Sequence, residues 1–169
     1  MIAMSALPSN EKEIVIRDDG QLKIRKEIAA SRKIVWRCLT EPNCLKAWWR
    51  DNIEFEPKEG GRFVEPWVDP TGRNRTTRAQ VTSFHPPHGF VMVWADEEWT
   101  FDTVVSVSLG ETESGTEVTI EHQGWEKAPE VDRSTLLLDH SAGWTAHLGN
   151  LATHAESHGD GPDGSGGRH

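Results

Sequence analysis

The chain has 169 residues with a formal net charge of −9 and 36% hydrophobic residues, which suits one domain with a sizeable core. The acidic balance argues against a nucleic-acid partner, because phosphate groups bind to basic surfaces. No apolar run approaches the ~18 residues of a membrane-spanning helix and residues 1–10 do not resemble a signal peptide, so we expect a cytoplasmic protein that does not enter membranes.

The first elements along the chain are a strand and two short helices. Apolar and charged residues alternate over 21–28, which predicts a half-buried strand. Ser31 is a suitable N-cap for a helix over 32–39, and a proline suits the first turn of a second helix over 43–49. We expect residues 1–20 to form an N-terminal extension that is partly disordered.

The middle of the chain has the pattern of successive strands. Glycine, proline and aspartate residues mark the turns between them. The expected strands are 53–55, 62–67, 76–84, 90–94, 99–109 and 116–122. Short connections between successive strands favour an antiparallel meander.

A long helix over 131–158 is the last predicted element. Its apolar stripe, which has His140 and His147 on or beside it, consists of Leu137, Trp144, Leu148 and Leu151. Gly143 is expected to allow a close approach of a neighbouring element beside the tryptophan. Residues 159–169 are rich in glycine and polar side chains, and we expect them to be a disordered tail.

These elements together predict an α+β domain over residues 21–158, in which a curved antiparallel sheet grips the long helix. The sheet cannot cover both its own concave face and the helix without leaving space between them. A ligand would occupy that space.

In the order of several short motifs, the chain resembles members of the SRPBCC (START-like, helix-grip) superfamily. Within it, the chain is most similar to the family named for the activator of the heat-shock-protein ATPase. The motifs are Ile28-Ala29-Ala30-Ser31, Val35-Trp36, Leu39-Thr40-Glu41-Pro42, Leu45 with Trp48-Trp49, Phe55 to Phe63, Trp94, Gly115-Thr116-Glu117-Val118, His122 with Gly124-Trp125, and His140 with Gly143-Trp144. The resemblance implies a helix-grip fold with an internal pocket, and the strands expected from the residue pattern would give its curved sheet about six to seven strands around the C-terminal helix. It does not choose a function, because fold analogy alone cannot.

Aromatic residues dominate the candidate ligand-binding positions. The chain has eight tryptophans and no tyrosine, which fits either dense core packing or a pocket for a flat apolar ligand. The candidate ligand-binding residues are Trp48, Trp49, Phe63, Trp67, Trp94, Trp99, Phe101, His122, Trp125, His140, Trp144 and Leu148.

Three titratable residues are candidates for catalysis. His122 has the strand parity of its apolar neighbours and should point inward, His140 lies near the apolar stripe, and Glu65 has the parity of Phe63 and Trp67. Each histidine is either a hydrogen-bonded structural residue or a polar anchor or general acid–base. An inward Glu65 would need a partner such as one of these histidines or an arginine, whereas an edge strand would expose it.

The sequence indicates no cofactor and no metal site. It contains no nucleophile motif and no phosphate-binding glycine loop, and its histidine pairs lack the further ligands of a structural zinc site. Cys38 and Cys44 are interpreted as reduced packing thiols.

Charge is unevenly distributed along the chain. Residues 1–80 carry 15 Lys and Arg against 12 Asp and Glu, a net of +3, whereas residues 81–169 carry 3 against 15, a net of −12. The acidic half is either a solvated sheet face or a docking surface for a basic protein partner.

Three functions therefore remain open. The first is binding or sequestration of a small hydrophobic molecule, aromatic or polycyclic, in the cavity between the sheet and the C-terminal helix. The second is a polyketide cyclase-like enzyme that uses the pocket histidines or Glu65, and the third is a co-chaperone-like interaction module. The oligomeric state is not indicated.

Overall fold

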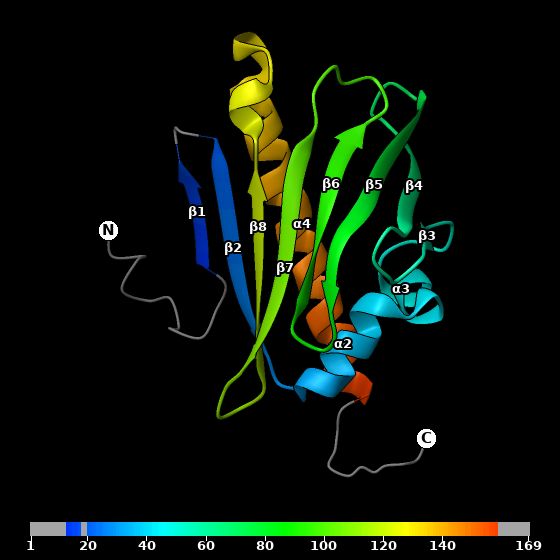
Figure 1. The fold of residues 1–169 in the computed structure, drawn as a ribbon, viewed down its shortest axis with the longest axis vertical. Helices are drawn as coiled ribbons and strands as arrows, with labels where there is room; N and C mark the ends of the chain where they lie inside the picture. The colour runs from blue at the N-terminus through cyan, green and yellow to red at the C-terminus, as the bar shows by residue number, and fades with distance from the viewer. Residues whose placement is uncertain (1–12, 18–19, 159–169) are drawn as a thin grey trace.

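The computed structural model describes residues 13–17 and 20–158 (Figure 1). Its elements are β1 (Glu13–Arg17), β2 (Gln21–Ile28), α2 (Arg32–Thr40), α3 (Pro42–Trp48), β3 (Glu54–Phe55), β4 (Arg62–Val68), β5 (Asn74–His85), β6 (Gly89–Asp96), β7 (Thr103–Glu111), β8 (Thr116–Gln123), the 3-10 turn η1 (Trp125–Lys127) and α4 (Glu130–His158). The disorder expected in residues 1–12, 18–19 and 159–169 concerns segments outside the described residues.

The described strands form one antiparallel sheet in the order β1-β2-β8-β7-β6-β5-β4-β3. The chain leaves β2 through α2 and α3, enters the far edge of the sheet at β3, and returns strand by strand until β8 pairs with β2. This confirms the predicted α+β helix-grip fold and its meander. Strand β1 lies in the segment expected to be an extension and had no counterpart among the predicted strands; it pairs with β2 from Glu13↔Arg25 to Arg17↔Gln21.

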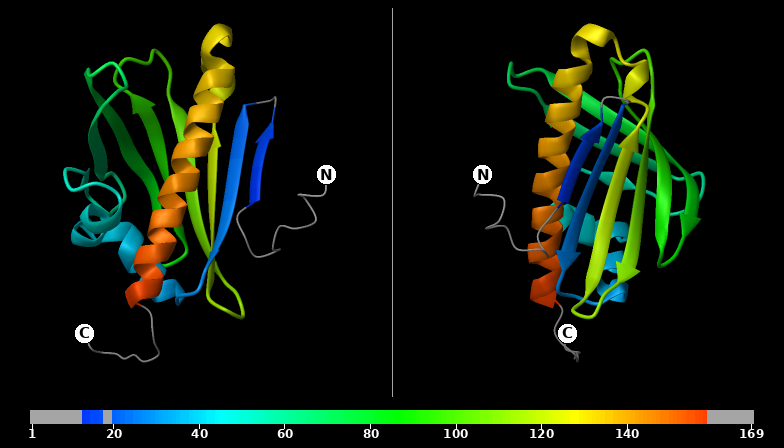
Figure 2. Two further views of the ribbon diagram at one scale, coloured as in Figure 1. Left: turned by 180° about the vertical axis from the view of Figure 1, so that it is seen from behind. Right: turned by 90° about the vertical axis from the view of Figure 1, so that its left-hand side faces the viewer.

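Helix α4 lies along one face of the curved sheet, and α2 and α3 lie at one end of it (Figure 2). The face of α4 toward the sheet buries Leu137, Ser141, Trp144, Leu148, Leu151, Ala152 and Ala155, so the predicted apolar stripe is confirmed. The prediction of a close approach at Gly143 is wrong, because no described atom of a neighbouring element lies within 4 Å of where its Cβ would be.

Local sequence signals explain the ends of several elements. The Ser31 hydroxyl accepts a hydrogen bond from the Ile34 N–H at 3.3 Å and caps α2, as predicted. The strand predicted from residue 99 begins only at Thr103, because the alternation of buried side chains in β7 starts there. Residues 97–102 form the loop between β6 and β7 and carry Trp99 and Phe101, whose rings stack at 4.7 Å.

Candidate functional site

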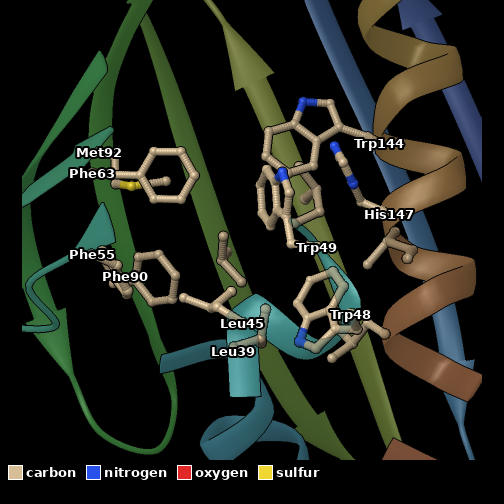
Figure 3. A pocket seen from close by; sticks show the side chains of 14 residues that line it. Leu39, Leu45, Trp48, Trp49, Phe55, Phe63, Phe90, Met92, Trp144 and His147 are labelled. Carbon is tan, nitrogen blue, oxygen red and sulfur yellow. The ribbon is translucent and has the colours of Figure 1, made fainter. Parts of the chain in front are cut away.

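A cavity lies between the sheet, α4 and the α2–α3 pair, where the sequence predicted free space (Figure 3). Phe63 and Met92 approach it from the sheet, Trp144 and His147 from α4, and Trp49 from the end of α3. The complete lining is Leu39, Leu45, Trp48, Trp49, Phe55, Phe63, Phe90, Met92, Val107, Ile120, Trp144, His147, Leu148 and Leu151. These side chains come from parts of the chain that only the fold brings together.

The cavity is narrow in this structure. Its volume is about 20 Å³ when measured as the space open to the centre of a water molecule, which is room for about one water. Ligand pockets commonly measure about 300–1,000 Å³. A larger ligand therefore enters only if part of the lining moves.

Trp49 and His147 are the two lining residues that are half-buried, while the other lining side chains are buried. Their rings stack, with centroids 4.1 Å apart and planes inclined by 29°. Trp144 meets both rings edge-on, at 5.8 Å from Trp49 and 5.9 Å from His147. The stacked pair therefore forms the part of the wall closest to solvent.

The indole N–H groups of the lining all have partners within the protein. Trp48 Nε1 donates to the Cys38 carbonyl at 2.8 Å, and Trp49 Nε1 donates to Glu65 Oε2 at 3.2 Å. Trp144 Nε1 donates to His122 Nδ1 at 3.0 Å. Because these donors are already used, the indoles present their apolar ring faces to the cavity.

His147 differs from the other lining residues. Its Nδ1 is buried and has no hydrogen-bond partner among the described residues, a feature shared there only with Trp94 Nε1, which is outside the lining. Burial, and secondarily the positive charge of Arg50, lower the pKa of His147 to about 4. The ring is therefore neutral at pH 7 and carries an unused polar atom.

Glu65, a candidate for catalysis, is hydrogen-bonded to Trp49 of the stacked pair and is buried, with 7% of its surface exposed. Its Oε2 accepts hydrogen bonds from Trp49 Nε1 at 3.2 Å and from Arg50 Nε at 3.1 Å. The partner is thus an arginine, one of the alternatives that the sequence left open. Burial raises the pKa of Glu65 even though Trp49 and Arg50 oppose that shift.

His122, a candidate for catalysis, has both ring nitrogens engaged. Nδ1 accepts from Trp144, so the proton is on Nε2, which donates to Thr103 Oγ1 at 2.7 Å, and this hydroxyl donates to the Trp94 carbonyl at 2.9 Å. The residue is 0% exposed, and burial holds its pKa well below the usual range. This arrangement holds β6, β7, β8 and α4 together and leaves neither nitrogen free to move a proton.

His140, the second histidine candidate, packs within a second aromatic cluster, which adjoins the cavity lining through Trp94 and His122. Its Nδ1 lies 3.0 Å from the Leu136 carbonyl one turn earlier in α4, and burial lowers its pKa. Its ring is 4.6 Å from Trp125 and 5.6 Å from Trp99, centroid to centroid. The members of this second cluster are Trp94, Trp99, Phe101, His122, Trp125 and His140.

The structure divides the candidate ligand-binding residues into three groups. Trp48, Trp49, Phe63, Trp144 and Leu148 line the cavity. The second cluster holds Trp94, Trp99, Phe101, His122, Trp125 and His140, outside the lining. Trp67 lies apart from both, where its Nε1 donates to Thr77 Oγ1 at 3.0 Å and Arg75 lies over its ring.

Several lining residues were not among the sequence candidates. Inward strand parity could have identified Phe90, Met92, Val107 and Ile120, because each alternates with more exposed neighbours. His147 is three residues after Trp144, which places both on one helix face. Nothing in the sequence indicates that its Nδ1 is buried without a hydrogen-bond partner.

The chemistry available in the cavity is mainly burial and stacking of apolar surface. In the described ranges, no three His, Cys, Asp or Glu side chains are arranged to hold a metal ion. Of the helices described, none combines the length and the apolar character needed to cross a bilayer.

Comparison with known proteins identifies one family. Residues 29–156 match the profile of the family described as Activator of Hsp90 ATPase homolog 1-like protein. No curated protein shows significant similarity to the chain.

Solved structures with the same fold are similar over most of the chain. A Rhodobacter sphaeroides protein is 24% identical with a TM-score of 0.71, over 87% of this chain and 99% of the other. CalU16 from Micromonospora echinospora is 22% identical with a TM-score of 0.62, over 86% and 83%. DynU16, described as a putative protein in the dynemicin biosynthetic locus, is 18% identical with a TM-score of 0.66, over 83% and 48%. At these identities the likeness shows the fold.

Proposed function

The chain belongs to the Activator of Hsp90 ATPase homolog 1-like family, and we propose that within this fold it binds or sequesters a small hydrophobic molecule of aromatic or polycyclic shape. The observation that carries the proposal is the incompletely filled cavity between the sheet and α4, whose lining is apolar and rich in aromatic rings. Burying apolar ligand surface there would contribute about 25 cal/mol per Å², and indole faces suit flat ligands.

Entry of such a molecule requires the wall to open, because the cavity has room for about one water. Trp49 is the lining residue best placed to move, because it follows the last residue of α3 and is half-buried. Its movement would break the stacking on His147, the hydrogen bond to Glu65 and the ring contacts with Trp48, Phe63 and Trp144. Displacing it would merge the cavity with solvent. Ligand binding in this account therefore includes a rearrangement of Trp49.

The proposal is tested by titration with N-phenyl-1-naphthylamine, an uncharged probe whose fluorescence rises in apolar surroundings. We expect saturable binding with one site per chain. Val107→Phe should abolish it, because Val107 lines the cavity and is buried. The matched control is Val104→Phe on the same strand, where the side chain has the opposite parity and is half-buried; it should bind the probe as the wild type does. Equal affinity of both variants for the probe would contradict binding in the cavity.

A cyclase-like enzyme is the second candidate. It gains support from one observation: a histidine with a free nitrogen, His147, lines the cavity, and Glu65 lies beside its stacking partner. DynU16, which has the same fold, is described as a putative protein in the dynemicin biosynthetic locus. The two candidates differ in turnover: a binding protein returns its ligand unchanged in mass and connectivity, whereas a cyclase releases a product with a new ring.

A further inference from the structure

The surface of the cavity is entirely apolar in this structure, so a polar group of the ligand can pair only with an atom that the movement of Trp49 uncovers. Trp48, Trp49 and Trp144 have already donated their indole hydrogens to the protein. Among the described lining side chains this leaves Nδ1 of His147 as the nitrogen that is both buried and without a hydrogen-bond partner. A buried polar atom without a hydrogen bond costs about 1–3 kcal/mol, so an occupant that satisfies it is favoured over one that does not.

The neutral ring of His147 can exist as either tautomer, so Nδ1 is either a donor or an acceptor. A hydroxyl group pairs with both forms, because it donates one hydrogen and accepts at its lone pairs. A carbonyl or an ether pairs with only one of them. A hydroxyl is therefore the ligand group best matched to this nitrogen.

Charge restricts the ligand further. The cation close enough to depress the pKa of His147 is Arg50, and its Nε is already bonded to Glu65 at 3.1 Å. A ligand carboxylate at His147 would lie near the Glu65 carboxyl group and compete with it for Arg50. A neutral ligand avoids this competition and the cost of burying a charge.

We propose that the ligand is a neutral aromatic alcohol of the phenol or naphthol type, whose hydroxyl group is bound by Nδ1 of His147 and whose ring packs against Trp144 in the space that the displaced Trp49 leaves. This inference rests on the proposed function and specifies its ligand class. His147 then acts as the polar anchor that selects hydroxylated molecules, and its stacking on Trp49 places the anchor at the part of the wall through which the ligand enters.

The test compares two molecules that differ by one hydroxyl, 1-naphthol and naphthalene, as competitors of bound N-phenyl-1-naphthylamine at pH 7. The wild type should bind 1-naphthol about tenfold more tightly than naphthalene, as expected for one net hydrogen bond of about 1.4 kcal/mol. In His147→Phe, which keeps a ring but removes the nitrogens, this ratio should fall to about one. The control His154→Phe changes a histidine of the same helix outside the lining and should keep the wild-type ratio.

A second measurement needs no variant. The ¹⁵N resonance of His147 Nδ1 in the wild type should shift on saturation with 1-naphthol and stay in place with naphthalene. If the two competitors keep the same affinity ratio in the wild type and in His147→Phe, or if the resonance responds equally to both, His147 is not the anchor and a trapped water alone satisfies its nitrogen. If neither competitor binds and the fluorescent probe is not bound either, the proposed function itself fails.

Discussion

At the scale of single residues, the hydrogen bonds of His122 explain why a histidine occupies the middle of an apolar core. Its neighbours across the sheet are Leu22 and Val105. A neutral imidazole at this position accepts from an indole and donates to Thr103, so both nitrogens are satisfied. Satisfied buried networks fix one arrangement of the elements that contribute to them.

Two substitutions of Trp144 separate its packing from its hydrogen bond. Trp144→Ala should lower the free energy of unfolding by about 3–5 kcal/mol, because it removes a large buried ring. Trp144→Phe keeps most of the ring and should cost only about 1–3 kcal/mol, mainly because His122 Nδ1 loses its donor. Urea denaturation of both variants measures the difference. A Trp144→Phe protein as stable as the wild type would show that this hydrogen bond contributes nothing.

Buried neutral histidines should make stability depend on pH. His147 has a folded-state pKa of about 4, whereas an unfolded histidine titrates near 6.5. Below pH 6.5 the unfolded state binds more protons, so stability is complete above that pH and is lost as the pH falls toward 4. Between pH 7 and pH 5 His147 alone should cost about 2 kcal/mol, and the lowered pKa values of His122 and His140 act in the same direction.

Urea denaturation of the wild type and His147→Phe at pH 7, 6 and 5 checks this contribution. The variant should lose about 2 kcal/mol less than the wild type over that range. The same substitution at His158, which is exposed at the end of α4, is the control and should follow the wild type. Parallel pH profiles for His147→Phe and the wild type would contradict the burial of a neutral ring at this position.

At the scale of elements, most of the architecture could be predicted from the sequence because its signals are local. The cap at Ser31, the alternation in β8 and the stripe of α4 each depend on neighbouring residues and period. The start of β7 and the existence of β1 could not be predicted equally well. Trp99 and Phe101 have strand-like character but stack on each other in a loop, and β1 exists through its pairing with β2.

Glycine substitutions test how closely the elements approach one another. In α4, Gly143→Ala should raise the free energy of unfolding by about 0.5–1 kcal/mol, because the added methyl group meets no described atom of another element within 4 Å and alanine favours a helix. At Gly115 the same change should destabilise the protein by about 1–3 kcal/mol, because a Cβ there would lie 2.1 Å from the Ile28 carbonyl oxygen. The melting temperatures of the two variants should shift in opposite directions. A lower melting temperature for Gly143→Ala would instead support the close approach that the sequence predicted.

At the scale of the whole molecule, the position of the cavity could be predicted but its lining only in part. A sheet that curves around a helix leaves space, and Trp48, Trp49 and Trp144 could be assigned to it from their places in the chain. The division of the tryptophans between the cavity lining and the adjoining second cluster depends on contacts between distant strands and loops. The unpaired nitrogen of His147 likewise depends on what all its neighbours have already bonded.

Binding of a ligand in the cavity is the central claim, and locating a bound ligand tests it most directly. Nuclear Overhauser effects between 1-naphthol and the ¹³C-labelled methyl groups of the protein locate it. We expect contacts to Val107, Ile120 and Leu148, which line the cavity. Contacts confined to the exposed side chains of Val68, Val131 and Leu138 would place the molecule on the surface and contradict a binding site between the sheet and α4.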